Sequence, residues 1–97
     1  MKSFYLGIDV SKGYADFVII DEKKQTVIQN FQLDDTFSSH SRLYEILQKF
    51  LAQYPKSTLY AAMESTGGYE SNWYNALTKF QASLNIKTAR LNPLAVM

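Results

Sequence analysis

Two acidic residues stand at the ends of apolar segments, and small residues follow each of them. Asp9 follows the apolar residues 4–8, and Glu64 follows the apolar residues 59–63. A carboxylate at the end of a buried strand is costly to half-bury unless something pairs with it. If the two strands are neighbours, the carboxylates form an anionic pocket, and a divalent cation such as Mg²⁺ or Mn²⁺ is a natural partner for it.

The first third of the sequence predicts an antiparallel meander. Residues 3–10 are almost continuously apolar and residues 14–20 are rich in β-formers, so both segments are expected to be strands. Residues 26–32 alternate between apolar and polar side chains, as in an edge strand that is half open to water. Turns this short join antiparallel neighbours.

The remaining elements alternate between helix and strand. Apolar residues at helical spacing predict a helix that begins with Ser38 or Ser39 as its N-cap and ends before Pro55. A strand at 58–63 follows, and then a second helix with Asn85 as its C-cap. The last strand spans residues 86–91, and Asn92-Pro93 stop it.

The element order β-β-β-α-β-α-β predicts an α/β fold with a mixed five-stranded sheet of order 3-2-1-4-5. The meander requires antiparallel pairs, and each helical crossover requires a right-handed parallel connection. The first and fourth strands are then adjacent and parallel, so Asp9 and Glu64 lie side by side. Ligand sites of open α/β sheets lie at such a reversal of the strand order.

Each acid also has a plain structural interpretation. Asp9 can cap the turn at residues 11–13, and Glu64 can be an acid at the start of a helix. Two carboxylates cannot hold two metal ions firmly, and no third acid is expected nearby. Asp16 lies within the second strand, and Asp21, Asp34 and Asp35 lie in turns at the wrong ends of the sheet or far along the chain.

Four residues beside the two acids are candidates for contact with nucleic acid. Lys12 either meets a phosphate beside Asp9 or is a solvated turn lysine, and Gly67 either shapes a turn or lets a phosphate approach a helix start. Tyr69 can stack on a base, and Thr66 belongs to the same segment.

Two further residues near these segments are expected to have no part in a site. Trp73 lies on the apolar stripe of the second helix and is expected in the core. His40 has no acid or second histidine at ligand spacing, so it is expected to be exposed and inert.

Composition narrows the class of protein. The 97 residues suffice for one domain, and the formal net charge of +1 gives no support to a module that grips DNA by itself. There is no cysteine, and neither a signal peptide nor a membrane-spanning segment is visible. A cytoplasmic location without a membrane partner is therefore expected.

The two acidic segments resemble the amino-terminal motifs of a known family. Gly7-Ile8-Asp9-Val10-Ser11-Lys12 and Met63-Glu64-Ser65-Thr66-Gly67-Gly68-Tyr69 are similar to those of the DEDD-type transposases of bacterial insertion sequences, a group that includes the Piv-like DNA invertases. Leu91-Asn92-Pro93 is similar to the segment after that family's fifth strand. The resemblance implies a RuvC-like fold, which is ribonuclease-H-like.

The resemblance also implies a catalytic role for both acids. Asp9 would be the first and Glu64 the second acid of a tetrad that binds Mg²⁺ or Mn²⁺. The last two acids of the family lie in a downstream Asp-x-x-Asp motif, so residues 1–97 are expected to be a partial catalytic domain that stops before it. We therefore expect this chain to be inactive alone. The resemblance implies a parent enzyme that acts on DNA as a homo-oligomer, in some members with a structured guide RNA.

Two other interpretations remain open. An actin-like or sugar-kinase ATPase also begins with a Gly-Ile-Asp strand and a hairpin, although Val10-Ser11-Lys12-Gly13 fits its phosphate-binding hairpin poorly. A ribonuclease-H-like scaffold that only mediates assembly is the other, because fold alone does not give function.

Overall fold

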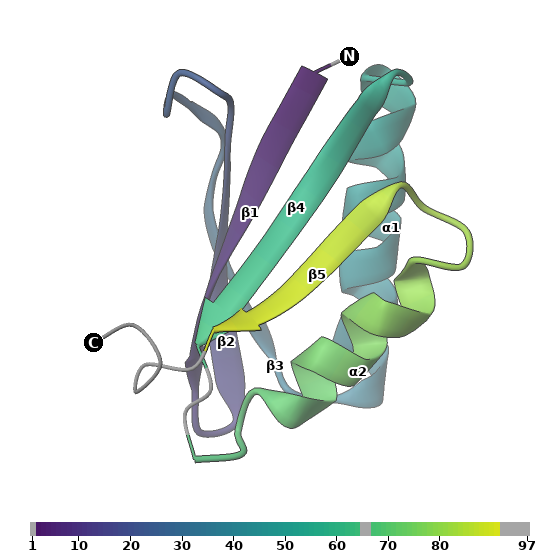
Figure 1. The fold of residues 1–97 in the computed structure, drawn as a ribbon. Coiled ribbons are helices and arrows are strands. Elements are labelled where there is room, and N and C mark those ends of the chain that lie inside the picture. The colour runs from purple at the N-terminus through teal and green to yellow at the C-terminus, as the bar shows by residue number, and fades with distance from the viewer. Residues whose placement is uncertain (1, 65–66, 92–97) are drawn as a thin grey trace.

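The computed structural model describes residues 2–64 and 67–91, and they form a single mixed sheet with two helices (Figure 1). The sheet has the order β3-β2-β1-β4-β5, which confirms the expected topology. Its elements are, along the chain, β1 (Lys2–Ser11), β2 (Tyr14–Ile20), β3 (Thr26–Asp34), α1 (Phe37–Gln53), β4 (Ser57–Glu64), α2 (Ser71–Phe80) and β5 (Ile86–Leu91).

The strand directions follow from the connections. Short turns make β1, β2 and β3 an antiparallel meander, and the two helical crossovers make β1, β4 and β5 parallel. The central strand β1 therefore has an antiparallel neighbour on one side and a parallel neighbour on the other. The carboxyl ends of β1 and β4 lie at the same edge of the sheet.

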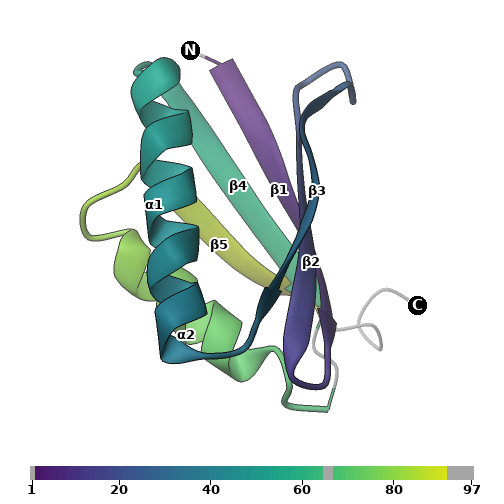
Figure 2. The same ribbon diagram turned by 180° about the vertical axis from the view of Figure 1, so that it is seen from behind.

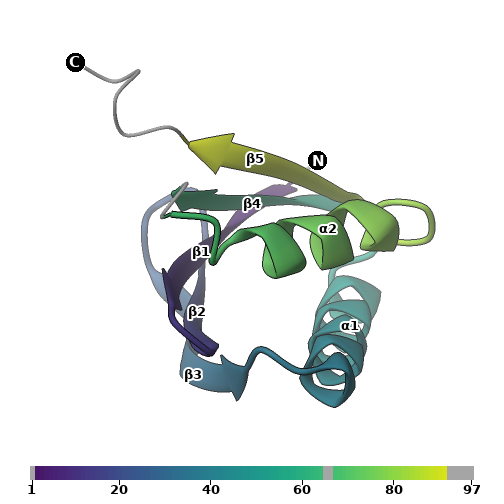
Figure 3. The same cartoon turned by 90° about the horizontal axis from the view of Figure 1, so that it is seen from below.

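Both helices cover the same face of the sheet, as Figures 2 and 3 show. Alternate strand residues point to that face and meet the apolar stripes of the helices, so one continuous core forms there. Its largest fully buried side chains are Trp73, Phe17, Leu6, Ile19, Leu43, Leu47, Leu59, Met63 and Leu77. Trp73 is completely buried, in agreement with its expected place in the core.

Two expected helix caps are wrong. Thr36, not Ser38 or Ser39, caps α1, and its hydroxyl accepts a hydrogen bond of 3.2 Å from the Ser39 amide. The second helix ends at Phe80, short of Asn85. Asn85 instead donates 2.8 Å to the carbonyl oxygen of Ser57, where it ties the approach to β5 to the start of β4.

Three of the five strands, β1, β3 and β4, are longer than expected at their ends. The third strand continues to Asp34 because Tyr14 and Asp34 pair across the sheet. Neither helix within the described residues is long and apolar enough to cross a membrane. Asn92-Pro93, the expected stop after β5, lies outside the described residues.

Candidate metal and nucleic-acid site

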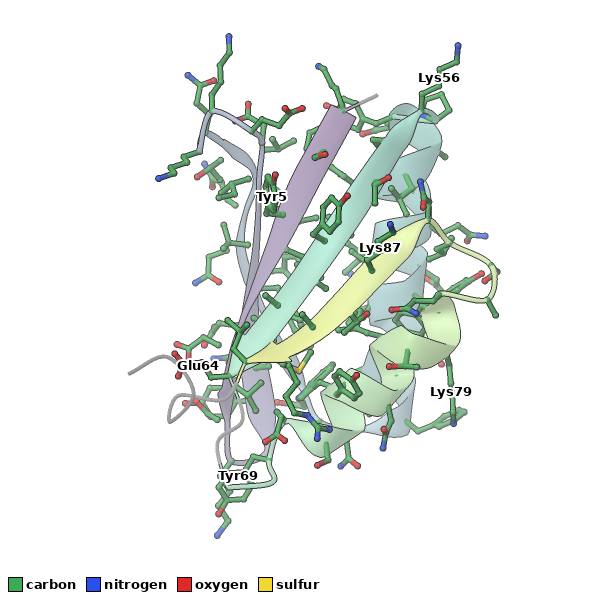
Figure 4. All side chains as sticks on the ribbon, in the orientation of Figure 1. Tyr5, Lys56, Glu64, Tyr69, Lys79 and Lys87 are labelled. Carbon is green, nitrogen blue, oxygen red and sulfur yellow. The ribbon has the colours of Figure 1, made fainter. Side chains whose placement is uncertain are left out.

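Asp9 and Glu64 are neighbours at one edge of the sheet. The parallel register between β1 and β4 pairs Ile8 with Met63, so the next residues along the two strands are the two acids. Ile8 and Met63 are buried under the helices, and the strand alternation therefore turns both carboxylates to the opposite face. Both acids are exposed there, and Figure 4 shows Glu64 at the carboxyl end of β4.

No described helix covers the face that carries these acids (Figure 3). The register arranges its side chains in three rows across β2, β1, β4 and β5. Farthest from the acids is the row Ile20, Tyr5, Tyr60 and Lys87, followed by the row Val18, Gly7, Ala62 and Ala89, and then by the row Asp16, Asp9, Glu64 and Leu91.

The middle row carries only short side chains, and it lies between a wall of two tyrosines and the row of acids. The Tyr5 and Tyr60 rings stack with their centroids 5.8 Å apart and form that wall. A shallow hollow of about 490 Å³ lies over Gly7 and Val18 and reaches the side chains of Asp9 and Asp16. The carboxylates of Asp9 and Asp16 therefore border open space that a ligand can enter.

Asp16 lies beside Asp9, contrary to the expectation that it is poorly placed. The antiparallel register pairs Asp9 directly with Asp16, so three carboxylates follow one another across β2, β1 and β4. Gln32 on β3 donates a hydrogen bond of 3.3 Å to the Asp16 carboxylate. The short turn at residues 12–13 fixes this register, and counting back from it in the sequence would have found the pair.

Carboxylates are suitable ligands for a hard divalent cation. The residues present are of the right chemical type, but they are too few to complete its coordination. Mg²⁺ takes oxygen ligands in octahedral geometry and keeps several waters, so an exposed carboxylate pair can hold it weakly. Among residues 2–64 and 67–91, no group of three or more histidine, cysteine, aspartate or glutamate side chains converges closely enough to hold a metal ion.

Two turns flank the carboxylates at the same edge of the sheet. Lys12 is exposed in the β1–β2 turn, and Tyr69 is 48% exposed in the segment before α2. Gly67 and Gly68 have φ angles of 66° and 95°, a region that favours glycine, and this agrees with the interpretation that they shape a turn. Thr66 lies outside the described residues. None of these observations assigns a nucleic-acid contact, and the four contacts stay predictions.

A buried carboxylate lies at the start of α2, and no pattern in the sequence predicts it. Glu70 is 2% exposed at the start of α2. Arg90 on β5 lies 3.4 Å from the Glu70 carboxylate, and its guanidinium stacks 4.3 Å from the centroid of the Tyr74 ring. The pair connects the segment that follows Glu64 to the neighbouring strand.

His40 is neither exposed nor without an acidic partner, so that expectation is wrong. Its Nε2 lies 2.8 Å from Asp35, and its ring packs edge-on against Trp73 at 4.6 Å. The acid precedes His40 by five residues, a spacing that is not typical of a helix contact. The connection between β3 and α1 folds back on the helix start, and this makes the contact possible.

Comparisons with known proteins agree with this geometry. Residues 6–97 match the family model DEDD_Tnp_IS110, which describes a transposase. No curated protein sequence matches the chain significantly.

Solved structures with low sequence identity share the fold. RuvC of Thermus thermophilus in complex with a Holliday junction substrate gives a TM-score of 0.62 at 8% identity, over 97% of this chain and 67% of that chain. The Holliday junction resolvase of fowlpox virus gives 0.52 at 14% identity, over 93% of this chain and 62% of that chain. This chain therefore spans about two thirds of the length of these structures.

Proposed function

The chain belongs to the IS110-type DEDD transposase family, and from this membership we propose that it supplies the first half of a metal-dependent site for DNA cleavage and strand exchange during transposition of an insertion element. Asp9 and Glu64 are the first two acids of that site. The last two acids come from outside residues 1–97.

The observation that carries the proposal is the register between β1 and β4. It brings together two acids that are 55 positions apart in the sequence, on a face where Asp9 borders open space. Matches to RuvC and to the fowlpox resolvase support a ribonuclease-H-like frame for such a site. The strand ends at this edge of the sheet are where ligands bind in open α/β sheets.

Each candidate residue has a definite task in this proposal. Asp9 and Glu64 hold Mg²⁺ or Mn²⁺, which when bound stabilises charge on a phosphodiester and activates a water or hydroxyl. Lys12 lies in a turn from which it can reach a backbone phosphate, and Tyr69 is exposed for stacking on a base. Gly67 and Thr66 would let the DNA backbone approach the segment after Glu64.

The isolated chain is not expected to cleave DNA. Two carboxylates leave two metal ions short of ligands, and a formal net charge of +1 gives little attraction to a polyanion. We propose that the complete recombinase works on DNA in the cytoplasm as a homo-oligomer, and that a structured guide RNA is a candidate partner.

A metal titration measured by isothermal calorimetry tests the assignment of the two acids as metal ligands. Wild-type protein should bind Mn²⁺ weakly, Asp9→Asn and Glu64→Gln should each lower the affinity about tenfold or more, and the control Asp34→Asn should not. Asp34 ends β3 and is exposed, so its replacement removes the same charge away from the pair. Equal affinities in Asp9→Asn and Asp34→Asn would sink the assignment.

A further inference from the structure

Asp35 connects three separate parts of the protein. It lies in the connection between β3 and α1, and its amide donates 2.9 Å to the carbonyl oxygen of Gly13 in the β1–β2 turn. One carboxylate oxygen lies 2.8 Å from His40 Nε2 on α1. The other accepts a hydrogen bond of 3.1 Å from the side-chain amide of Asn72 on α2. Both oxygens of a single side chain are therefore engaged by the two helices.

Burial strengthens this arrangement. The Asp35 and His40 side chains are only 15% and 20% exposed, so water competes weakly for their hydrogen bond. Because the carboxylate is the acceptor, His40 Nε2 carries a proton in this contact. The ring is also packed against Trp73, which itself meets Phe17 of β2 at 5.2 Å. The Asp35–His40 contact is thus held against the hydrophobic core through the His40 ring.

The two segments that Asp35 holds each follow one acid of the proposed site. Gly13 closes the turn that begins three residues after Asp9. Asn72 is the second residue of α2, which follows Glu64 after a short connection. Figure 1 shows these two segments at the same end of the molecule. Loosening either segment frees the end of the strand that carries an acid.

We propose that Asp35, through His40 and Asn72, is a positioning residue for the Asp9–Glu64 pair. This inference rests on the proposed function. Asp35 touches neither metal nor DNA, and it lies on the helix side of the sheet. It holds the β1–β2 turn and the start of α2 at a fixed separation, so that the carboxylates at the ends of β1 and β4 stay side by side. The same contacts set the separation of Lys12 and Tyr69, because these residues lie next to Gly13 and to the start of α2.

Mn²⁺ affinity in a graded set of variants tests the inference. Asp35→Ala should weaken Mn²⁺ binding about tenfold, the lower end of what outer partners of metal ligands contribute. Asp35→Asn should fall between Asp35→Ala and wild type, because an amide offers one acceptor where the carboxylate offers two. The control Asp34→Ala removes the adjacent charge and should leave the affinity unchanged. Equal affinities for folded Asp35→Ala and Asp34→Ala would overturn the inference.

A second measurement separates this inference from the proposed function. Amide hydrogen exchange without metal should be faster in Asp35→Ala at the start of α2, where the side-chain link to Asn72 is lost, and unchanged there in Asp34→Ala. Loss of Mn²⁺ binding in Asp9→Asn tests the proposed function independently. If Asp9→Asn binds Mn²⁺ as wild type does, the proposed function fails, and unaltered exchange in Asp35→Ala still decides against the positioning role.

A milder variant serves if Asp35→Ala does not fold. Asn72→Ala removes only the link to α2, at an exposed residue. It should raise exchange at the start of α2 and weaken Mn²⁺ binding, with a far-ultraviolet circular dichroism spectrum like that of the wild type. Wild-type exchange and wild-type affinity in this variant would also contradict the inference.

Discussion

Replacing Asp9 by asparagine should stabilise the metal-free protein. Asp9 is the middle member of a row of three carboxylates, with Asp16 opposite it on β2 and Glu64 next to it on β4. Like charges that face each other across strands are destabilising. A site that suits a cation is therefore under electrostatic strain without it, and Asp9→Asn removes the charge that repels both neighbours.

The magnitude follows from the spacing of paired residues. Side chains directly opposite each other have Cβ atoms about 4.5–5.5 Å apart, and each like-charge pair costs roughly 0.2–1 kcal/mol. Coulomb's law in bulk water gives about 0.8 kcal/mol for two unit charges near 5 Å, which agrees with that range. Two such pairs give about 0.4–2 kcal/mol, or roughly 2–16 °C in melting temperature for a domain of this size.

Thermal unfolding in low salt without divalent ions measures this effect. Asp34→Asn is the control, since it removes a carboxylate outside the row. The gain in Asp9→Asn should shrink at about 1 M salt, where the Debye length falls to about 3 Å. Saturating Mn²⁺ should reverse the order, because a ligand at free concentration c that binds only the folded state stabilises the protein by RT ln(1 + c/Kd), and the wild type has the lower Kd. A lower melting temperature for metal-free Asp9→Asn would refute the reasoning and favour a capping role for Asp9.

The structure makes three further predictions. Arg90→Ala should lower the free energy of unfolding by about 2 kcal/mol in a denaturant titration. This lies between the effects of breaking a surface pair and a buried pair, because Glu70 is buried while Arg90 is 38% exposed. The exposed control Lys87→Ala on the same strand should change the free energy of unfolding little, and equal effects of the two substitutions would contradict this role for the pair. Gly68→Ala should lower the free energy of unfolding by about 1–2 kcal/mol, because its φ of 95° disfavours a side chain. Gly7→Ala is the control, since its Cβ would lie 3.4 Å from Val18 in ordinary contact. The same titration checks both variants, and an equal loss of stability in the two would count against backbone strain. Purified protein should not cleave branched DNA with Mg²⁺ or Mn²⁺ in a gel assay, and metal-dependent cleavage that Asp9→Asn abolishes would show that the acids within residues 1–97 suffice.

The topology could be predicted because short-range signals determine it. Two turns too short for crossovers make the first three strands antiparallel, and two amphipathic helices make the last strands parallel. Asp9 and Glu64 become neighbours once that order is known, and the observed register agrees. The helix ends were less certain, since Thr36 and two nearby serines all suit an N-cap, and the backbone geometry chooses Thr36.

The contacts around the acids could not be predicted to the same degree. Arg90 and Glu70 lie 20 residues apart and meet only because β5 and α2 pack together. The same holds for Asp35 and Asn72, which are 37 residues apart. Asp16 differs from these because the hairpin register already contains its position opposite Asp9. A place inside a strand does not exclude Asp16 from the site, because the strand alternation turns its side chain to the same face as Asp9.

The central claim is that Asp9 and Glu64 together hold a divalent ion. Anomalous diffraction from crystals soaked in Mn²⁺ tests it most directly. We predict a peak at the carboxyl ends of β1 and β4, on the uncovered face, in contact with both carboxylates and absent from Asp9→Asn crystals. A peak elsewhere, or one that persists in Asp9→Asn, would contradict the account.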